Sequence, residues 1–109
     1  MKITFDELTA SVEKRFEPVE IELPSGTVTL VNAQRQPKEW RTEMQTLLRA
    51  VFDADDDTSE EQALADVKAA LKYAAVENFD LLEAALGDDM LIWFEVFRSY
   101  ISNGLVGEG

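Results

Sequence analysis

The most apolar run in the chain covers residues 90–101, and its apolar side chains recur at the spacing of a helix. Most of the circumference is apolar, through Met90, Ile92, Trp93, Phe94, Val96, Phe97, Tyr100 and Ile101, which leaves a polar strip of Glu95, Arg98 and Ser102. Such a helix is usually central and buried, although a partner-binding face is an alternative. We expect Asp88 to cap its N-terminus and Asn103-Gly104 to end it. A run of about 12 residues is too short for a membrane span, which needs about 20.

The beginning of the chain predicts a second amphipathic helix. Thr4 and Glu7 have the spacing of a capping box, in which the threonine hydroxyl accepts a hydrogen bond from a backbone N–H in the first turn. An apolar face follows at helical spacing, comprising Phe5, Leu8, Val12 and Phe16. Because Pro18 cannot continue a helix, we expect this one to cover residues 5–16.

Two strictly alternating stretches, residues 19–23 and 27–31, predict β-strands joined by the turn residues Pro24-Ser25-Gly26. The polar side chains of these strands should face solvent: Glu20, Glu22, Thr27 and Thr29. Two strands alone are marginally stable in water, so the hairpin must pack on helices or pair with another chain. An unpaired hairpin edge also allows copies of the chain to associate into a homo-oligomer.

A further helix should begin at Pro37, a residue that suits the first turn. Its apolar face comprises Trp40, Met44, Leu47, Leu48 and Val51, and its polar face Arg41, Glu43, Gln45 and Arg49. It ends at the aspartate-rich residues 53–57. An EF-hand loop beginning at Asp53 fails, because Thr58 stands where glycine is needed and Leu64 where glutamate is needed. We interpret the stretch as a solvated acidic loop.

Two helices are expected after this loop. Ser59 and Gln62 form a second possible capping box. The buried face of the helix that follows should comprise Leu64, Val67, Leu71 and Ala74. Asp80 is expected to cap a short helix that ends at Leu86, with Gly87 in the left-handed conformation after it.

Together these elements predict a mainly helical α+β fold: an N-terminal helix, one β-hairpin and about four further helices. The chain has 109 residues, a length that fits one compact domain. We expect this domain to comprise residues 1–103 and residues 104–109 to form a flexible C-terminal tail.

The composition favours binding over catalysis. Asp and Glu total 22 against 10 Lys and Arg, a formal net charge of −12, which repels nucleic-acid phosphate. The chain has no His and no Cys, so the commonest general base, the usual zinc ligand and thiolate chemistry are all missing. We therefore expect no enzymatic activity, cofactor, metal or membrane partner. Acidic residues at the start of the chain, where a signal peptide is apolar, indicate an intracellular protein.

The order of several short segments resembles the tail assembly chaperones of long-tailed bacteriophages that infect actinobacteria, and of related prophages. The matching segments are Ile-Thr-Phe-Asp-Glu-Leu (3–8), Glu-Lys-Arg-Phe-Glu-Pro (13–18), the hairpin leading into Val-Asn-Ala-Gln-Arg-Gln-Pro-Lys (31–38), the aspartate-rich loop, Leu-Gly-Asp-Asp (86–89) and the Gly/Glu tail. The stretch before Pro37 departs from the family, in which a more apolar segment is expected.

The resemblance implies a protein that binds the long, helical tape measure protein and keeps it soluble while tail tube subunits assemble around it. Its partners would be the tape measure protein and the tail tube protein. It would act in the cytoplasm of the bacterial host and be absent from the mature virion. A longer form made by ribosomal frameshifting is common in the family, and residues 104–109 would then be the junction.

An amphipathic face that covers apolar client helices would suit this role. Candidate partner-binding residues are Trp40, Met44, Leu48, Trp93 and Phe97, since Trp and Met are favoured at adaptable interfaces. The alternative for each is a place in the core.

Two other functions fit the sequence. The charge of −12 fits an acidic mimic of DNA that inhibits a host nucleic-acid-binding protein. A minor structural protein of the tail is the second alternative, and it would be found in purified particles.

Overall fold

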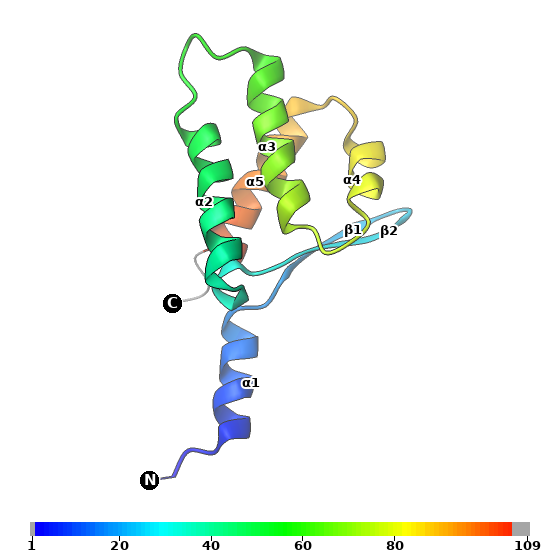
Figure 1. Ribbon diagram of the computed structural model, residues 1–109. Helices are drawn as coiled ribbons and strands as arrows, with labels where there is room; N and C mark the ends of the chain where they lie inside the picture. The colour runs from blue at the N-terminus through cyan, green and yellow to red at the C-terminus, as the bar shows by residue number, and fades with distance from the viewer. Residues whose placement is uncertain (1, 106–109) are drawn as a thin grey trace.

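A computed structural model describes residues 2–105 as five α-helices and one antiparallel β-hairpin (Figure 1). The elements in chain order are α1 (Phe5–Arg15), β1 (Val19–Leu23), β2 (Gly26–Leu30), the 3-10 turn η1 (Ala33–Arg35), α2 (Lys38–Phe52), α3 (Glu60–Ala74), α4 (Phe79–Leu86), α5 (Met90–Tyr100) and the π-helical turn η2 (Ile101–Leu105). The predicted fold class, mainly helical α+β with one hairpin, is confirmed.

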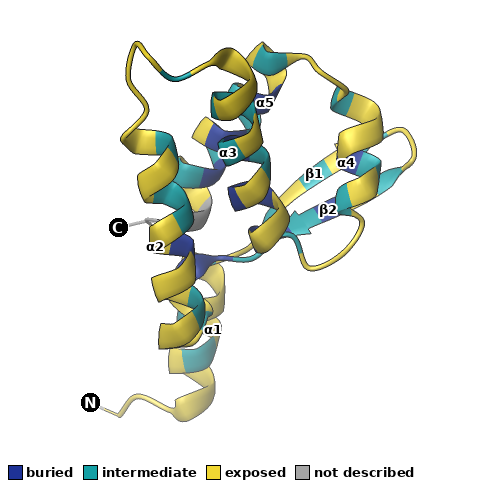
Figure 2. Cartoon of the chain, turned by 45° about the horizontal axis from the view of Figure 1, so that its top comes forward, coloured by how far each residue is buried: buried dark blue, intermediate teal, exposed yellow. Residues whose placement is uncertain are grey.

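The core lies where α2, α3, α5 and the hairpin meet, and α4 covers the far end of the hairpin (Figures 1 and 2). Its buried apolar side chains are Val28, Leu30, Met44, Val67, Ala70, Leu71, Ala74, Leu82, Trp93, Phe97 and Tyr100. The small residues Ala70 and Ala74 allow α3 to lie close to its neighbours. Two polar side-chain groups reach into this core and are satisfied there. The Trp93 indole N–H donates to the Gly87 carbonyl at 2.8 Å, and the Tyr100 hydroxyl donates to the Val31 carbonyl at 2.8 Å.

The predicted hairpin is present, but its turn has two residues and not three, because Gly26 pairs with Leu23 across Pro24-Ser25. Strand β2 begins at Gly26 and ends at Leu30, one residue earlier at each end than the alternation predicted. Gly26 has a φ of +151°, a value that side-chain-bearing residues rarely adopt. The side chains of Val28 and Leu30 are fully buried against the helices, so the hairpin is stabilised by packing, as its marginal intrinsic stability requires.

The predicted capping threonine and serine are both confirmed. The Thr4 hydroxyl accepts from the Glu7 backbone N–H at 3.1 Å, and the Ser59 hydroxyl accepts from the Gln62 backbone N–H at 3.1 Å. Helix α2 begins one residue later than expected, because Pro37 occupies the N-cap position and not the first turn.

Two other predicted caps are wrong. Asp89, not Asp88, caps α5, because the helix begins at Met90 and the cap must directly precede it. Asp80 lies within the first turn of α4, and Asn78 holds the cap position in the left-handed conformation, with φ of 63°.

Helix α5 is buried along one stripe and not around most of its circumference. Trp93, Phe97 and Tyr100 form the stripe, whereas Ile92, which we expected on the buried side, is 47% exposed and Leu91 is 81% exposed. The helix also continues past the predicted stop at Asn103-Gly104, into η2. Of the tail predicted at residues 104–109, the backbone of 104 and 105 lies in η2, and residues 106–109 lie outside the described residues.

Helix α1 projects from the rest of the chain (Figure 1). None of its residues is buried. The radius of gyration is 15.6 Å, against about 13 Å for a compact chain of this length, and the longest dimension is 56 Å. Between residues 2 and 105, no helix is both long and apolar enough to cross a membrane.

Candidate partner-binding surfaces

The structure places three of the five candidate partner-binding residues in the core. Met44 is 1% exposed, and Trp93 and Phe97 are likewise buried. Trp40 and Leu48 are half-buried and pack against the edge of the core. In this conformation a partner reaches only Trp40 and Leu48 without opening the core.

Of the three aromatic candidates, Trp93 and Phe97 share the buried stripe of α5, whereas Trp40 lies on α2. The Trp40 ring stacks on the Tyr73 ring of α3, with centroids 5.1 Å apart. The Trp93 ring packs beside Phe79, and the Lys68 ammonium lies 5.1 Å from its centroid. These contacts assign the Trp40 and Trp93 rings to structural roles within the fold.

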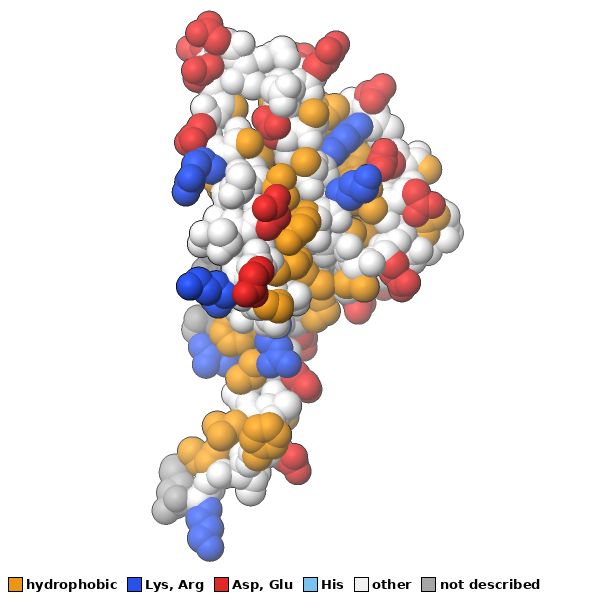
Figure 3. All heavy atoms as spheres, viewed as in Figure 1, with side chains coloured by type: hydrophobic (Ala, Val, Ile, Leu, Met, Phe, Trp, Pro, Cys, Tyr) orange, Lys and Arg blue, Asp and Glu red, His pale blue; other side chains and the backbone are white. Residues whose placement is uncertain are grey.

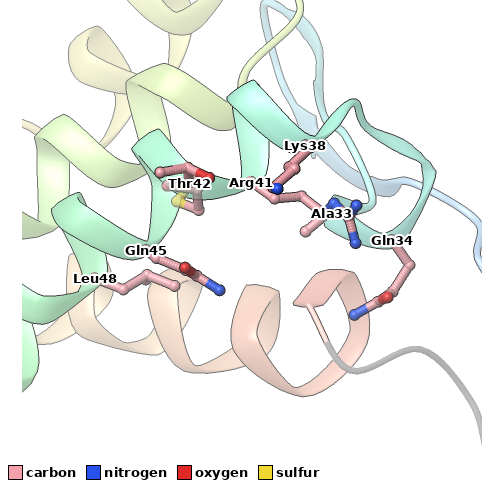
Figure 4. A pocket seen from close by; sticks show the side chains of 8 residues that line it. Ala33, Gln34, Lys38, Arg41, Thr42, Gln45 and Leu48 are labelled. Atoms are coloured by element: carbon pink, nitrogen blue, oxygen red, sulfur yellow. The ribbon is translucent and has the colours of Figure 1, made fainter.

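Met44 and Leu48 do share one feature, a pocket of about 450 Å³ beside α2 and η1. In Figure 4 the side chains of α2 reach towards the C-terminal end of α5, and those of η1 close one end. The lining residues are Ala33, Gln34, Lys38, Arg41, Thr42, Met44, Gln45 and Leu48. The lining includes two cationic side chains, two amides and the apolar side chains of Met44 and Leu48. This combination suits a peptide segment that carries both polar and apolar side chains. Metal binding needs a different donor set, and among residues 2–105 no group of three acidic side chains is placed to hold a metal ion.

An exposed apolar surface follows α1; we define this α1 face as Ile3, just before the helix, with Phe5, Leu8 and the half-buried Val12. Phe5 is 79% exposed, Ile3 60% and Leu8 52%. Figure 3 shows apolar side chains at the surface of the projecting helix. The sequence predicted an apolar face of Phe5, Leu8, Val12 and Phe16. Periodicity alone cannot show whether the body of the protein or a partner covers such a face. Glu17-Pro18 separates the helix from the hairpin, and this break is the sequence feature that indicates a helix apart from the body.

Helix α1 is stabilised locally at both ends. Thr4 caps it, acidic residues occupy the first turn, and Lys14 and Arg15 occupy the last turn, where their charges favour the helix dipole. Even so, helices shorter than about 12–15 residues are marginal in water without tertiary packing, and α1 has 11 residues. A partner that covers the α1 face would therefore stabilise the helix as well as bury apolar surface.

Comparison with known proteins gives a family. A family model described as mycobacteriophage tail assembly protein matches residues 2–109. The chain belongs to this family. No curated protein and no solved structure matches the chain. The resemblance to actinobacteriophage tail assembly proteins noted from the sequence is thereby confirmed.

Acidic side chains are spread over the face of this tail assembly protein seen in Figure 3, and several of them lie in the loop between α2 and α3. Within it the Asp57 backbone N–H donates to the Asp55 carboxylate at 2.9 Å, and the Asp55 backbone N–H donates to the Thr58 hydroxyl at 3.1 Å. These bonds close the loop by short-range turns. On α5, the Arg98 guanidinium donates to the Glu95 carboxylate and lowers the pKa of that carboxyl.

Proposed function

We propose that this tail assembly protein is a chaperone that binds the tape measure protein and keeps it soluble while tail tube subunits assemble around it. Family membership supports a role in tail assembly. The observation that carries the finer proposal is the α1 face, an apolar helical stripe on a helix with no buried residue. Such a stripe suits an amphipathic client helix, which covers it by helix-to-helix packing.

The strength expected of this contact is modest. Complete burial of one large apolar side chain contributes about 1.5–3 kcal/mol. Ile3, Phe5 and Leu8 are each half to four-fifths exposed, so covering all three contributes about 3–6 kcal/mol before the cost of association. Because the cost of association offsets most of this contribution, the α1 face alone gives weak, reversible binding, which suits a chaperone that must leave the client as the tube forms.

The charge supports the same role. A net charge of −12 keeps a complex with an apolar client in solution through repulsion between complexes. The proposal involves no catalytic step, cofactor or metal. It places the protein in the cytoplasm of the bacterial host, with the tape measure and tail tube proteins as partners, and outside the mature virion.

Co-expression with the tape measure protein tests the proposal. The double variant Phe5→Asp/Leu8→Asp should leave the tape measure protein insoluble, because it places two charges on the α1 face. The matched control Ala10→Asp/Lys14→Gln makes the same change in net charge on the exposed, opposite side of α1 and should keep the client soluble. Both variants should retain the thermal unfolding midpoint of the wild type, since α1 contributes nothing to the core.

Met44→Asp is unsuitable for this test, because it places a carboxylate in the core and destabilises the fold itself. If the two α1 variants keep the client soluble equally well, the α1 face is not the client-binding surface. Recovery of the chain as a stoichiometric component of purified particles would instead favour a structural tail protein. Capture of a host nucleic-acid-binding protein, with release by salt, would favour a DNA mimic.

A further inference from the structure

The two edges of the hairpin differ. On the outer edge of β2, the Thr29 carbonyl accepts from the Val76 backbone N–H at 3.0 Å, and the Val31 N–H donates to the Ala74 carbonyl at 2.9 Å. The Asn78 side-chain amide donates to the Thr27 carbonyl at 3.3 Å. The segment after α3 therefore pairs with this edge along its length.

The register shows which groups of β1 point away from β2. Along a strand, the backbone N–H and C=O groups of successive residues point alternately to one side and to the other. The carbonyls of Thr27 and Thr29 point away from β1, towards the segment after α3. Their partners in the register are Glu22 and Glu20, so the backbone groups of these two glutamates point outward as well. Among the described residues, none of these outward groups of Glu20 and Glu22 has a hydrogen-bond partner, and the hairpin has no third strand.

A groove of about 360 Å³ runs along this free edge, between β1 and α5. Val19 and Ile21 of β1 and Val96 of α5 form its apolar walls, and Glu95 and Ser99 complete the side formed by α5. Glu20 and Glu22 also line the groove, although their exposed side chains alternate with those of Val19 and Ile21 and so point to the other face of the strand.

We propose that the free edge of β1 binds an extended peptide segment in which apolar residues alternate with Lys or Arg. A strand added at this edge completes the outward hydrogen bonds of Glu20 and Glu22. Since successive side chains point to opposite faces, every second residue enters the groove beside Ile21 and Val96. The residues between them lie beside the two glutamates on the solvent face, where a cation is favoured.

Charge decides between a basic partner strand and a second copy of this chain. Pairing β1 with β1 of another copy would bring Glu20 and Glu22 against the same residues of that copy, and like charges across a strand pair are destabilising. A basic strand forms opposite-charge pairs at the same positions. The proposal does not depend on the α1 face or on chaperone activity, because it concerns another surface.

Titration with synthetic peptides of seven residues tests the proposal by amide NMR. A peptide of alternating Lys and Val should protect the Glu20 and Glu22 amides from hydrogen exchange, whereas a Glu/Val peptide of the same length should bind at least about tenfold more weakly. Methylating the backbone nitrogens along one edge of the Lys/Val peptide should abolish binding, because the peptide then lacks the donors for β1.

Two protein variants separate backbone pairing from charge. Glu22→Pro removes an outward N–H and keeps the hydrogen bonds to β2, so it should abolish binding of the Lys/Val peptide. Glu22→Ala keeps the N–H and should weaken binding about twofold to threefold. Equal binding of the N-methylated and unmodified peptides would overturn the proposal, as would protection of Glu20 and Glu22 in the free protein that rises with its concentration.

Discussion

Replacing Tyr100 by phenylalanine tests how the last helix is joined to the hairpin. The Tyr100 ring is fully buried, and its hydroxyl donates at 2.8 Å to the carbonyl of Val31, just after β2. Tyr100→Phe keeps the ring and removes this one hydrogen bond. A hydrogen bond contributes about 0.5–1.5 kcal/mol net, and a buried acceptor left without a donor costs about 1–3 kcal/mol. Because Val31 is only half-buried, water can reach part of its surroundings, and we expect a loss of about 1–2 kcal/mol.

The pH dependence of the unfolding free energy gives a second, independent test of the buried Tyr100 hydroxyl. Burial raises the pKa of the Tyr100 hydroxyl well above its ordinary value of 10, so ionisation is easier in the unfolded chain than in the folded one. The stabilising contribution is complete below pH 10 and declines as the pH rises towards the folded-state pKa. The difference in unfolding free energy between wild type and Tyr100→Phe should therefore shrink by about 1.4 kcal/mol from pH 9 to pH 11.

Urea unfolding followed by tryptophan fluorescence measures both effects. Tyr73→Phe is the matched control: Tyr73 is exposed at 36%, and its replacement should change stability by less than about 0.5 kcal/mol at pH 7. The reasoning is refuted if Tyr100→Phe is as stable as Tyr73→Phe at pH 7. It is also refuted if the difference from wild type stays constant between pH 9 and pH 11.

Three further substitutions test the packing, the hairpin turn and a helix cap by the same urea assay. Leu82→Ala should cost about 2–5 kcal/mol because the side chain is fully buried. The control Leu91→Ala, at an 81% exposed position of α5, should change stability by less than about 0.5 kcal/mol. Equal losses in the two variants would contradict the described burial. Gly26→Ala should cost at least about 1 kcal/mol, since φ is +151° and the added Cβ would lie 3.0 Å from the Leu81 Cδ1 atom; an unchanged midpoint would show that the turn adopts another conformation. Ser59→Ala should cost about 1 kcal/mol through loss of the α3 cap, and no loss would mean that another group caps the helix.

Much of the body was predictable because its apolar periodicity and its packing agree. The apolar face of α2 around Met44 does lie against the core, with Arg41 and Arg49 on the exposed side. The hairpin followed from strict alternation and its turn residues, and Thr4 and Ser59 from the capping box. These features depend on neighbours in sequence, and local interactions decide them.

The rest depends on contacts that periodicity cannot show. An apolar helical face has the same spacing in α1, where Phe5 is exposed, and in α2, where Met44 is buried. The sequence therefore pointed to Met44 and Trp93 as candidate partner residues and not to Phe5. The predicted caps of α4 and α5 were misplaced because each helix has two candidate capping residues close together. They are Asn78 and Asp80 at α4, and Asp88 and Asp89 at α5. Which one caps is set by where tertiary packing begins the helix.

Photo-crosslinking during tail assembly tests the central claim, that the α1 face contacts the tape measure protein, most directly. Photoreactive benzoylphenylalanine would replace Phe5 on this face, and in a second protein Ala10 on the opposite side of α1. The account predicts a crosslink to the tape measure protein from position 5 and none from position 10. It is contradicted if position 5 crosslinks only to other copies of this chain, or if both positions crosslink to the tape measure protein equally.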